Sequence, residues 1–279
     1  AVILGTKGYE HRGVDRTQIE QSIRGSQAAF TEVLRVNTGL IRTIMPTSDL
    51  VTEMFDVGNR VPLKCAIMYL NSIANPCLVE EVRRRIRGIS TDYVIDIGAF
   101  EQFIEDHPQL PFPQALSTER PDRVSVHLVE GRIAILLDGS PFVHIVPINI
   151  FTFFHSVEDF SFKPLAGTFM RLLRITGTFL SVVLPAIYLS LSYFHPEALP
   201  TDLVLAIAGA RERVPFPALI EILLMEISFE LIREAGIRVP GLLGSTIGIV
   251  GAIILGQAAV TANLVSPIMV VIIALTGLA

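Results

Sequence analysis

Five ionisable side chains lie within or directly after a strongly apolar stretch that runs from residue 218 to residue 232: Glu221, Glu226, Glu230, Arg233 and Glu234. A helix turns by about 100° per residue, so the last four fall within an arc of roughly 100°, and Glu221 lies off that arc. Ionisable groups are costly at membrane depth and usually face a bundle interior or an aqueous path. One interpretation is therefore a polar lining of a pathway for ions or solutes. An amphipathic helix at the membrane interface, with its acids in water, fits the pattern equally well.

Charge pairing within this stretch is only partly favourable. Glu230 and Arg233 stand three residues apart, a spacing at which opposite charges meet on a helix. Glu226 and Glu230, like Glu230 and Glu234, are like charges at a spacing of four residues. Such pairs require a counter-charge or water, which a pathway or an interface would supply.

Four glycines follow the acidic stretch at spacings of three, four and three residues, which places them on one helix face: Gly241, Gly244, Gly248 and Gly251. Gly244 and Gly248 form a GxxxG motif, and small residues of this kind let helix backbones approach closely in lipid. Packing of helices within one subunit explains such a face. Self-association of identical subunits is the sharper alternative.

Charge is distributed unevenly along the chain. Residues 1–165 contain 16 Lys or Arg and 20 Asp or Glu, whereas residues 166–279 contain 6 and 7. The mean hydropathy of +0.55 is too high for an ordinary soluble domain. We therefore expect a polar α/β domain followed, over residues 166–279, by an incomplete all-α domain of several transmembrane helices. Because the chain starts at Ala1 and ends inside an apolar run, we interpret it as truncated at both ends.

Two uncharged segments are long enough to cross a bilayer. Ile175–Phe194 has 20 residues without a charge, which span about 30 Å as a helix, the thickness of a hydrocarbon core. Val239–Ala279 has 41 residues without Asp, Glu, Lys, Arg or His, enough for two spans with a break near Asn263–Pro267. Leu203–Ala210 is too short to cross and predicts an interfacial or re-entrant segment. The number of crossings therefore stays open.

The charges that flank the first span indicate its orientation. Lys163, Arg171 and Arg174 precede it, whereas the segment from His195 to Asp202 has no Lys or Arg. Positively charged flanks favour the cytoplasmic side of a membrane. We therefore expect the polar domain to be cytoplasmic.

The alternation of strand and helix patterns in the polar domain predicts an α/β fold. We expect two small subdomains, residues 1–110 and 111–165, divided at a proline-rich loop. Periodicity, glycines and prolines mark the expected elements. Strands are expected at Ala1–Leu4, Leu63–Leu70 and Tyr93–Ile97, and a hairpin is expected from Arg132–Asp138 and Phe142–Pro147. Helices are expected from Ser26 to Pro46, over Pro76–Arg87 and over Phe100–Asp106.

Several classes of function find no support in the sequence. The net charge of −5 argues against nucleic acid as a partner. The histidines have no metal-ligand spacing, and there is no Walker loop, GxSxG or dinucleotide-binding glycine motif, so we expect no enzyme, metal or cofactor. Cys65 and Cys77 belong to no ligand cluster, and free thiols fit a reducing cytoplasm.

A basic cluster stands near the end of the helix expected over residues 76–87: Arg83, Arg84, Arg85 and Arg87. Glu80 and Glu81 precede Arg84 and Arg85 by four residues, which favours ion pairs on a solvated helix. Contact with acidic lipid headgroups is the alternative.

Distinct short motifs occur along nearly the whole chain. Two of them are highly specific, Thr118-Glu119-Arg120-Pro121-Asp122 and Pro215-Phe216-Pro217. The others are Ile23-Arg24-Gly25, Phe30-Thr31-Glu32, Asn37, Val79-Glu80-Glu81-Val82, Arg85, Phe112-Pro113-Gln114, Glu130-Gly131-Arg132, Asp138-Gly139-Ser140-Pro141, Glu230, Arg233-Glu234-Ala235-Gly236 and Val265-Ser266-Pro267. In type and order they resemble the motifs of the GerA-type spore germination protein family, A-subunit class.

The resemblance implies a protein of the spore inner membrane, with a cytoplasmic N-terminal domain of two α/β subdomains. It implies assembly with B and C subunits into a receptor for nutrient germinants. It further implies self-association, with a pentamer expected, into a ligand-gated cation channel that starts germination. Nutrient recognition is usually assigned to the B subunit, so no ligand-binding residue is carried over.

Two departures from the family pattern keep other interpretations open. Asp15-Arg16 stands where the family commonly has Glu-Pro, and Arg24-Gly25-Ser26 stands where it has Arg-Gly-Pro. A paralogue that is not a receptor subunit is therefore an alternative to the channel subunit. A scaffold subunit that conducts nothing is another, and a secondary transporter is a weaker third because broken helices with intramembrane acids also occur there.

Overall fold

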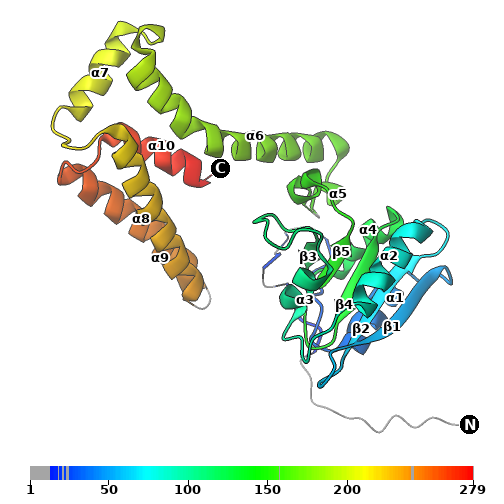
Figure 1. Ribbon diagram of the computed structural model, residues 1–279. Helices are drawn as coiled ribbons and strands as arrows, with labels where there is room; N and C mark the ends of the chain where they lie inside the picture. The colour runs from blue at the N-terminus through cyan, green and yellow to red at the C-terminus, as the bar shows by residue number, and fades with distance from the viewer. Residues whose placement is uncertain are drawn as a thin grey trace, which may run out of the picture. The chain divides into compact units, whose positions relative to one another are not determined.

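The computed structural model describes residues 13–17, 19–20, 22, 25–156, 158–239 and 242–278. The chain folds into two compact units (Figure 1): the polar unit, residues 1–169, and the helical unit, residues 170–279. The boundary lies close to the point where the charge density of the sequence falls. The strand expected at Ala1–Leu4 lies outside the described residues.

A five-stranded sheet forms the centre of the polar unit. Its strands, all antiparallel to their neighbours, lie in the order β1-β2-β4-β5-β3. Cys65 is opposite Leu137, and Ile135 is opposite His144. The strands are β1 (Leu50–Val57), β2 (Leu63–Leu70), β3 (Leu116–Thr118), β4 (Ile133–Leu137) and β5 (Val143–Val146).

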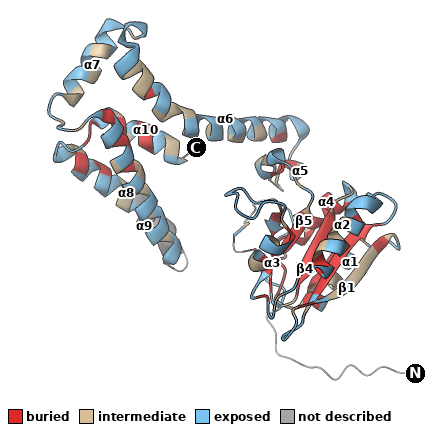
Figure 2. Cartoon of the chain, in the orientation of Figure 1, coloured by how far each residue is buried: buried red, intermediate tan, exposed pale blue. Residues whose placement is uncertain are grey.

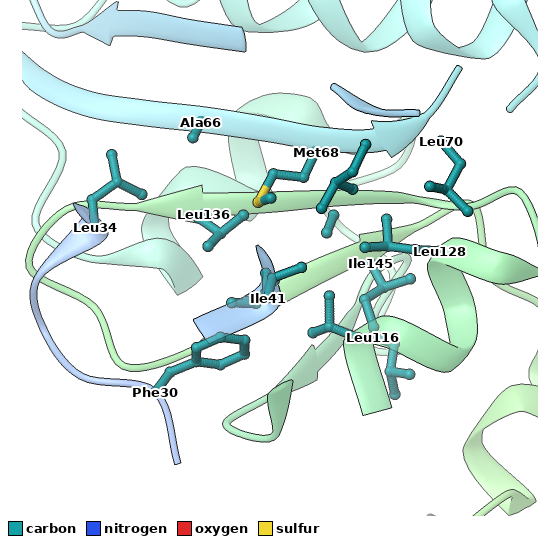
Figure 3. Packing of buried hydrophobic residues seen from close by; sticks show 14 residues of the cluster. Phe30, Leu34, Ile41, Ala66, Met68, Leu70, Leu116, Leu128, Leu136 and Ile145 are labelled. Carbon is teal, nitrogen blue, oxygen red and sulfur yellow. The ribbon is translucent and has the colours of Figure 1, made fainter. Parts of the chain in front are cut away.

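Helices cover both faces of this sheet, and their bounds are α1 (Leu34–Ile44), α2 (Pro76–Arg87), α3 (Ile97–Ile104) and α4 (Pro121–Val129). Helices α1 and α4 share one apolar core with the sheet, and α2 and α3 share the other. Figure 3 shows the first core, in which Phe30 and Ile41 lie against Leu136 and Ile145. Alternate side chains of a strand point to opposite faces, so all five residues of β4 are buried, and Figure 2 shows the burial concentrated in the sheet.

Three predictions for the polar unit are confirmed. The strand Leu63–Leu70 and the helix Pro76–Arg87 have the expected bounds, and β4 and β5 form the expected hairpin. The helix begins where the Asn75 side chain accepts a hydrogen bond of 3.0 Å from the Cys77 amide. Proline at the first helical position suits such a start, since its missing N–H is not needed there.

The first helix begins later than the sequence predicts. Residues 28–30 are extended: the Ala29 amide donates to the Asp15 carbonyl (2.9 Å) and the Phe30 amide to the Glu119 carbonyl (2.9 Å). Helix α1 starts only at Leu34, whose amide donates to Asp138 Oδ1 at 3.0 Å. The capping carboxylate lies about a hundred residues away along the chain, so local periodicity could not locate this helix start.

Two further predictions were wrong in their bounds or type. Tyr93–Ile97 is not a strand, because Asp96 caps a helix instead: its Oδ1 accepts a hydrogen bond of 2.8 Å from the Ala99 amide. Helix α3 therefore runs over Ile97–Ile104 rather than Phe100–Asp106. An Asp before an apolar periodic run is an N-cap signal that outweighs a short β-branched stretch.

Strand β1 and helix α4 had no sequence prediction. Both complete the polar unit: β1 forms an edge of the sheet, and α4 covers its first core. Residue 110, the expected boundary between two subdomains, lies within this unit. Strand β2, which precedes it, pairs directly with β4, which follows it.

The helical unit contains helices from the rest of the chain. Helix α6 (Pro164–Leu189) begins in the polar unit and continues through a π-helical turn, η2 (Ser190–Phe194). The remaining helices are α7 (Thr201–Arg211), α8 (Ala218–Arg238), α9 (Leu242–Thr261) and α10 (Pro267–Leu278). The expected break near Asn263–Pro267 is confirmed, and Asn263 adopts a positive φ of 56° there.

Within the described residues, one helical stretch has the length and hydropathy of a membrane span. It covers Pro164–Phe194, 31 residues, and includes the predicted span Ile175–Phe194. Shorter apolar helical stretches cover Val250–Thr261 and Pro267–Gly277. Pro185 lies inside α6, and Figure 1 shows the helix bending along its length, as an internal proline causes.

Candidate functional site

Glu221 differs from the other acids of α8. Its side chain is 0% exposed, whereas those of Glu230 and Glu234 are more than half exposed. Glu221 is also the acid that lies off the predicted arc. The sequence pattern therefore separated it correctly from the others, although the pattern alone did not indicate which acids are buried.

Two elements supply partners to this buried carboxylate. Arg211, the last residue of α7, places Nε and Nη2 each 3.3 Å from Glu221 Oε1. The Ser266 amide, at the break between α9 and α10, donates to Glu221 Oε2 at 2.8 Å. We call Tyr193, Arg211, Glu221 and Ser266 the Glu221 junction.

Tyr193 joins the end of η2 to the same cluster. Its hydroxyl accepts a hydrogen bond of 2.7 Å from Arg211 Nη2 and another of 2.8 Å from the Ala218 amide. The Arg211 guanidinium also lies over the Tyr193 ring, 5.1 Å from its centroid. Tyr193 thus holds the Arg211 guanidinium beside the Glu221 carboxylate. A buried carboxylate requires a partner of opposite charge and hydrogen bonds to its oxygens.

Local sequence explains why these elements meet here. Pro217 caps α8, so the Ala218 amide has no partner within its own helix and is free to bond to Tyr193. Pro267 begins α10, and the Ser266 hydroxyl before it accepts a hydrogen bond of 3.4 Å from the Met269 amide. The motifs Pro215-Phe216-Pro217 and Val265-Ser266-Pro267 thus stand at two helix starts that border the Glu221 junction.

The remaining predicted lining residues do not join this junction. Glu230 forms the expected pair with Arg233 (2.5 Å), and Glu234 pairs with Arg238 (2.8 Å). Glu226 is half-buried and accepts a hydrogen bond of 3.5 Å from the Thr276 hydroxyl. Arg211 and Tyr193 were not predicted as site residues. The signal for Arg211 was a cation at the end of an apolar segment too short to cross a membrane.

The glycine face is described at one of its four positions. A Cβ built on Gly251 would lie 3.3 Å from Ile232 Cγ2, so α9 packs closely on α8 of the same chain at this point. This contact fits the interpretation of packing within one subunit. Gly241 lies outside the described residues, and Gly244 and Gly248 lie in α9.

A second polar cluster lies in the polar unit, on the most specific predicted motif. Arg120 is 1% exposed, yet its guanidinium makes five hydrogen bonds. It donates to the Glu20 carbonyl (3.0 Å), to Ser22 Oγ (2.6 Å) and to the Ser26 carbonyl (2.7 Å). Asp122 accepts the other two, at 3.0 and 2.7 Å. We call Arg120 and these partners the Arg120 hub.

Neighbouring motif residues hold the same N-terminal segment. Glu119 Oε1 accepts hydrogen bonds from the amides of Ile19 (2.7 Å) and Glu20 (2.9 Å). The Thr118 hydroxyl donates to the Glu20 carboxylate at 2.5 Å. Pro121 begins α4, where a helix start favours the Asp122 carboxylate.

Gly25 connects the motif Ile23-Arg24-Gly25 to the Arg120 hub. Its φ is +117°, a conformation that residues with a Cβ rarely adopt, and an added Cβ would lie 3.5 Å from Arg120 Nη2. Two motifs almost a hundred residues apart in sequence therefore form one structural element. Arg24 lies outside the described residues.

The whole chain, residues 1–279, matches the model of the Bacillus/Clostridium GerA spore germination protein family. The chain belongs to the GerA family. The family predicted from the motifs is thereby confirmed, and the residues of the Arg120 hub account for its most specific motif in physical terms.

Curated proteins of Bacillus subtilis are similar to the chain over its full length. Spore germination protein KA of Bacillus subtilis (strain 168) is 43% identical over 279 residues, 100% of this chain and 51% of that protein. The uncharacterized membrane protein YfkQ of the same organism is 42% identical over 278 residues, 100% of this chain and 54% of that protein. The chain therefore spans about half the length of these relatives.

One solved structure is similar to part of the chain. The N-terminal domain of the A subunit of the Bacillus megaterium spore germinant receptor GerK3 is 40% identical. The match covers 44% of this chain and 97% of that one, with a TM-score of 0.36.

The basic cluster on α2 is largely neutralised by acids. Arg83 contacts Glu53 (2.5 Å) and Glu80 (2.8 Å), and Arg85 contacts Glu81 (2.7 Å). Hydrogen bonds from Arg84 and then Arg85 lower the pKa of Glu81 to about 2. These pairs match the prediction of a solvated, ion-paired helix.

Among the described residues, no group of three or more His, Cys, Asp or Glu could hold a metal ion.

Proposed function

We propose that the protein is a membrane subunit of a spore germinant receptor, of the A type, and that its copies assemble into an ion channel whose opening starts germination. Membership of the GerA family supports the link to germination. The motifs that resemble those of the A-subunit class, Thr118-Glu119-Arg120-Pro121-Asp122 and Pro215-Phe216-Pro217, support the subunit type. Assembly with B and C subunits, location in the spore inner membrane and a cytoplasmic polar unit belong to the same proposal.

One observation carries the membrane part of this proposal: α8 buries a carboxylate and exposes many large apolar side chains. The carboxylate of Glu221 is fully buried. Large apolar residues of α8 are exposed instead: Leu219, Ile220, Leu223, Ile227, Leu231 and Ile237. The exposed charges of this helix are paired near its C-terminal end, Glu230 with Arg233 and Glu234 with Arg238. Proteins in water bury such side chains, whereas lipid favours apolar surfaces and polar groups satisfied inside. We therefore assign α6 to a full crossing and include α8, α9 and α10 in the membrane domain.

Glu226 is our candidate for the ion pathway. The other acids of α8 have an arginine within 3.3 Å: Arg211, Arg233 and Arg238 serve Glu221, Glu230 and Glu234. A paired carboxylate presents little net charge to a passing cation. Glu226 instead accepts a hydrogen bond of 3.5 Å from the Thr276 hydroxyl, and a ring of such acids from several copies would favour cations.

The same pairing also favours a second function, a subunit that anchors the receptor and conducts nothing. In that case the exposed pairs on α8 would contact other subunits. Oligomeric state and crosslinking separate the two functions. A channel requires several copies of this protein in one complex, and a scaffold requires contacts chiefly with different subunits.

Ion release from spores that produce the full-length protein tests the channel directly. Glu226→Gln should change the rate of ion release while the protein accumulates normally. Glu197→Gln, an exposed acid in the segment between α6 and α7, is the matched control and should leave the rate unchanged. Unchanged release in Glu226→Gln spores, together with a monomer of the full-length protein in detergent, would remove the channel proposal.

A further inference from the structure

A short 3-10 helix that precedes α6 also buries its polar residue and exposes apolar ones. In η1 (Ile150–Phe154), the one polar residue, Thr152, is 2% exposed. Its apolar neighbours are exposed: Ile150 by 63%, Phe151 by 63% and Phe153 by 41%. We call Ile150, Phe151 and Phe153 the juxtamembrane patch.

Hydrogen bonds fix this inverted orientation. Asn149 Oδ1 accepts from the Thr152 amide at 3.1 Å, and the Asn149 amide donates to Thr152 Oγ1 at 3.4 Å. Arg132 Nη1 also donates to Thr152 Oγ1, at 3.2 Å. The capping box and the arginine hold Thr152 inward, so the patch cannot turn into the core without breaking them.

The C-terminal end of η1 is tied to the polar unit as well. Arg123 Nη2 donates to the carbonyl of His155, the residue after the helix, at 3.1 Å. The patch is therefore held on a folded surface at both ends. Exposed apolar patches on ordered surfaces mark contact with a partner or with a membrane.

Position in the chain indicates which of the two. Only residues 155–163 separate η1 from Pro164, the start of α6, and four of them form the short helix α5 (Glu158–Ser161). A chain of that length keeps η1 within a few tens of ångströms of the helix that we assign to the membrane. Lys163, Arg171 and Arg174 lie at the same end of α6. Cations beside apolar aromatic residues suit the boundary between anionic headgroups and acyl chains.

We propose that the juxtamembrane patch inserts into the headgroup region of the bilayer and holds the polar unit against the membrane surface. The partner is thus a lipid surface rather than another protein. This inference rests on the proposed crossing by α6. It assigns lipid contact to η1 and not to the basic cluster of α2, in which Arg83, Arg84 and Arg85 are paired with acids.

The sequence offers a direct test, because the 279 residues contain no tryptophan. Three variants of the chain, each with one tryptophan, are reconstituted into vesicles of phosphatidylcholine and phosphatidylglycerol. Phe151→Trp reports the patch, and Phe179→Trp, 63% exposed within α6, reports the span. Met54→Trp, 55% exposed on edge strand β1, is the control in water. Lipids brominated high on the acyl chain quench indoles at the interface, and iodide quenches indoles in water.

With brominated lipid, the fluorescence of the Phe151→Trp variant should fall about twofold, as for an aromatic residue at the headgroup boundary, and that of Met54→Trp should not. Iodide should quench Met54→Trp only. Quenching of Phe151→Trp by iodide overturns the inference. Shielding of this indole from both quenchers also overturns it, because protein would then cover the patch. If Phe179→Trp escapes quenching by lipids brominated deep in the acyl chain, the crossing by α6 fails first, and the inference fails with it.

Discussion

Arg211 at the end of α7 and Glu221 in the first turn of α8 form an ion pair of 3.3 Å, and the Glu221 carboxylate is wholly buried. The pair joins two helices across a loop that contains the Pro215-Phe216-Pro217 motif. The Ser266 amide extends it to the break before α10. Three segments of the helical unit therefore depend on one buried charge.

Replacing only the arginine of this pair should destabilise the protein more than replacing both partners with apolar residues. Arg211→Met leaves Glu221 charged and unpaired and should lower the unfolding free energy by about 3 kcal/mol. The double variant Arg211→Met with Glu221→Leu should recover part of that loss, because no buried charge remains. Thermal unfolding in detergent measures both. Additive losses in the double variant would contradict a coupled pair.

The Arg120 hub should not tolerate lysine. A lysine ammonium has three donors and no planar fork, so Arg120→Lys leaves buried acceptors unsatisfied and should lower stability by about 3 kcal/mol. Amide hydrogen exchange of residues 25–30 should also become faster. Arg60→Lys is the matched control: its side chain is 81% exposed and pairs with Asp92, so its effect should stay within about 0.5 kcal/mol.

Two glycine substitutions should act in opposite directions. Gly25→Ala places a Cβ at φ +117° and should lower stability by about 1–2 kcal/mol. Gly39→Ala lies inside α1 with nothing within 4 Å of the new Cβ, and it should raise stability by about 0.5–1 kcal/mol. Urea unfolding of both variants gives the comparison. Equal effects would mean that the backbone at Gly25 is not held by the hub.

Glu101 should make stability pH-dependent near neutrality. Burial, with a contribution from Glu105, raises the pKa of Glu101 from 4.5 to about 7. A raised carboxyl pKa means that its contribution is complete below pH 4.5 and is lost as pH rises through about 7, by about 2–3 kcal/mol.

Glu101→Gln should therefore flatten the stability profile between pH 4.5 and 7. Burial lowers the pKa of His144, which has the opposite slope. His144 Nε2 lies 3.5 Å from Glu101 Oε2, so the difference between the two proteins reports Glu101 together with its effect on His144. Unfolding in urea at several pH values measures the profile. Parallel profiles for the two proteins would show that Glu101 is ionised in the fold.

The two cysteines should differ in reactivity. Burial raises the pKa of the Cys65 thiol to about 12, whereas Cys77 is exposed. Only the thiolate reacts, so a maleimide should label one thiol in the folded protein and both after unfolding. Mass spectrometry counts the labels. Rapid labelling of Cys65 in the folded protein would indicate that β2 opens in solution.

Periodicity and composition by themselves determined a large part of this protein. The strand Leu63–Leu70, the helix Pro76–Arg87, the β4–β5 hairpin and the break before Pro267 all follow from local residue patterns. The change from polar to apolar composition placed the boundary between the two units. These features depend on neighbours along the chain, which a sequence displays directly.

Tertiary structure alone decided the features that depend on distant partners. The start of α1 is set by Asp138, and the conformation at Gly25 is set by Arg120. The buried state of Glu221 depends on Arg211 and Ser266, so the sequence could mark five ionisable residues on α8 but not which one is enclosed. Hydrogen bonds and ion pairs act over about 3 Å in space regardless of sequence separation. Only the folded chain brings such partners together.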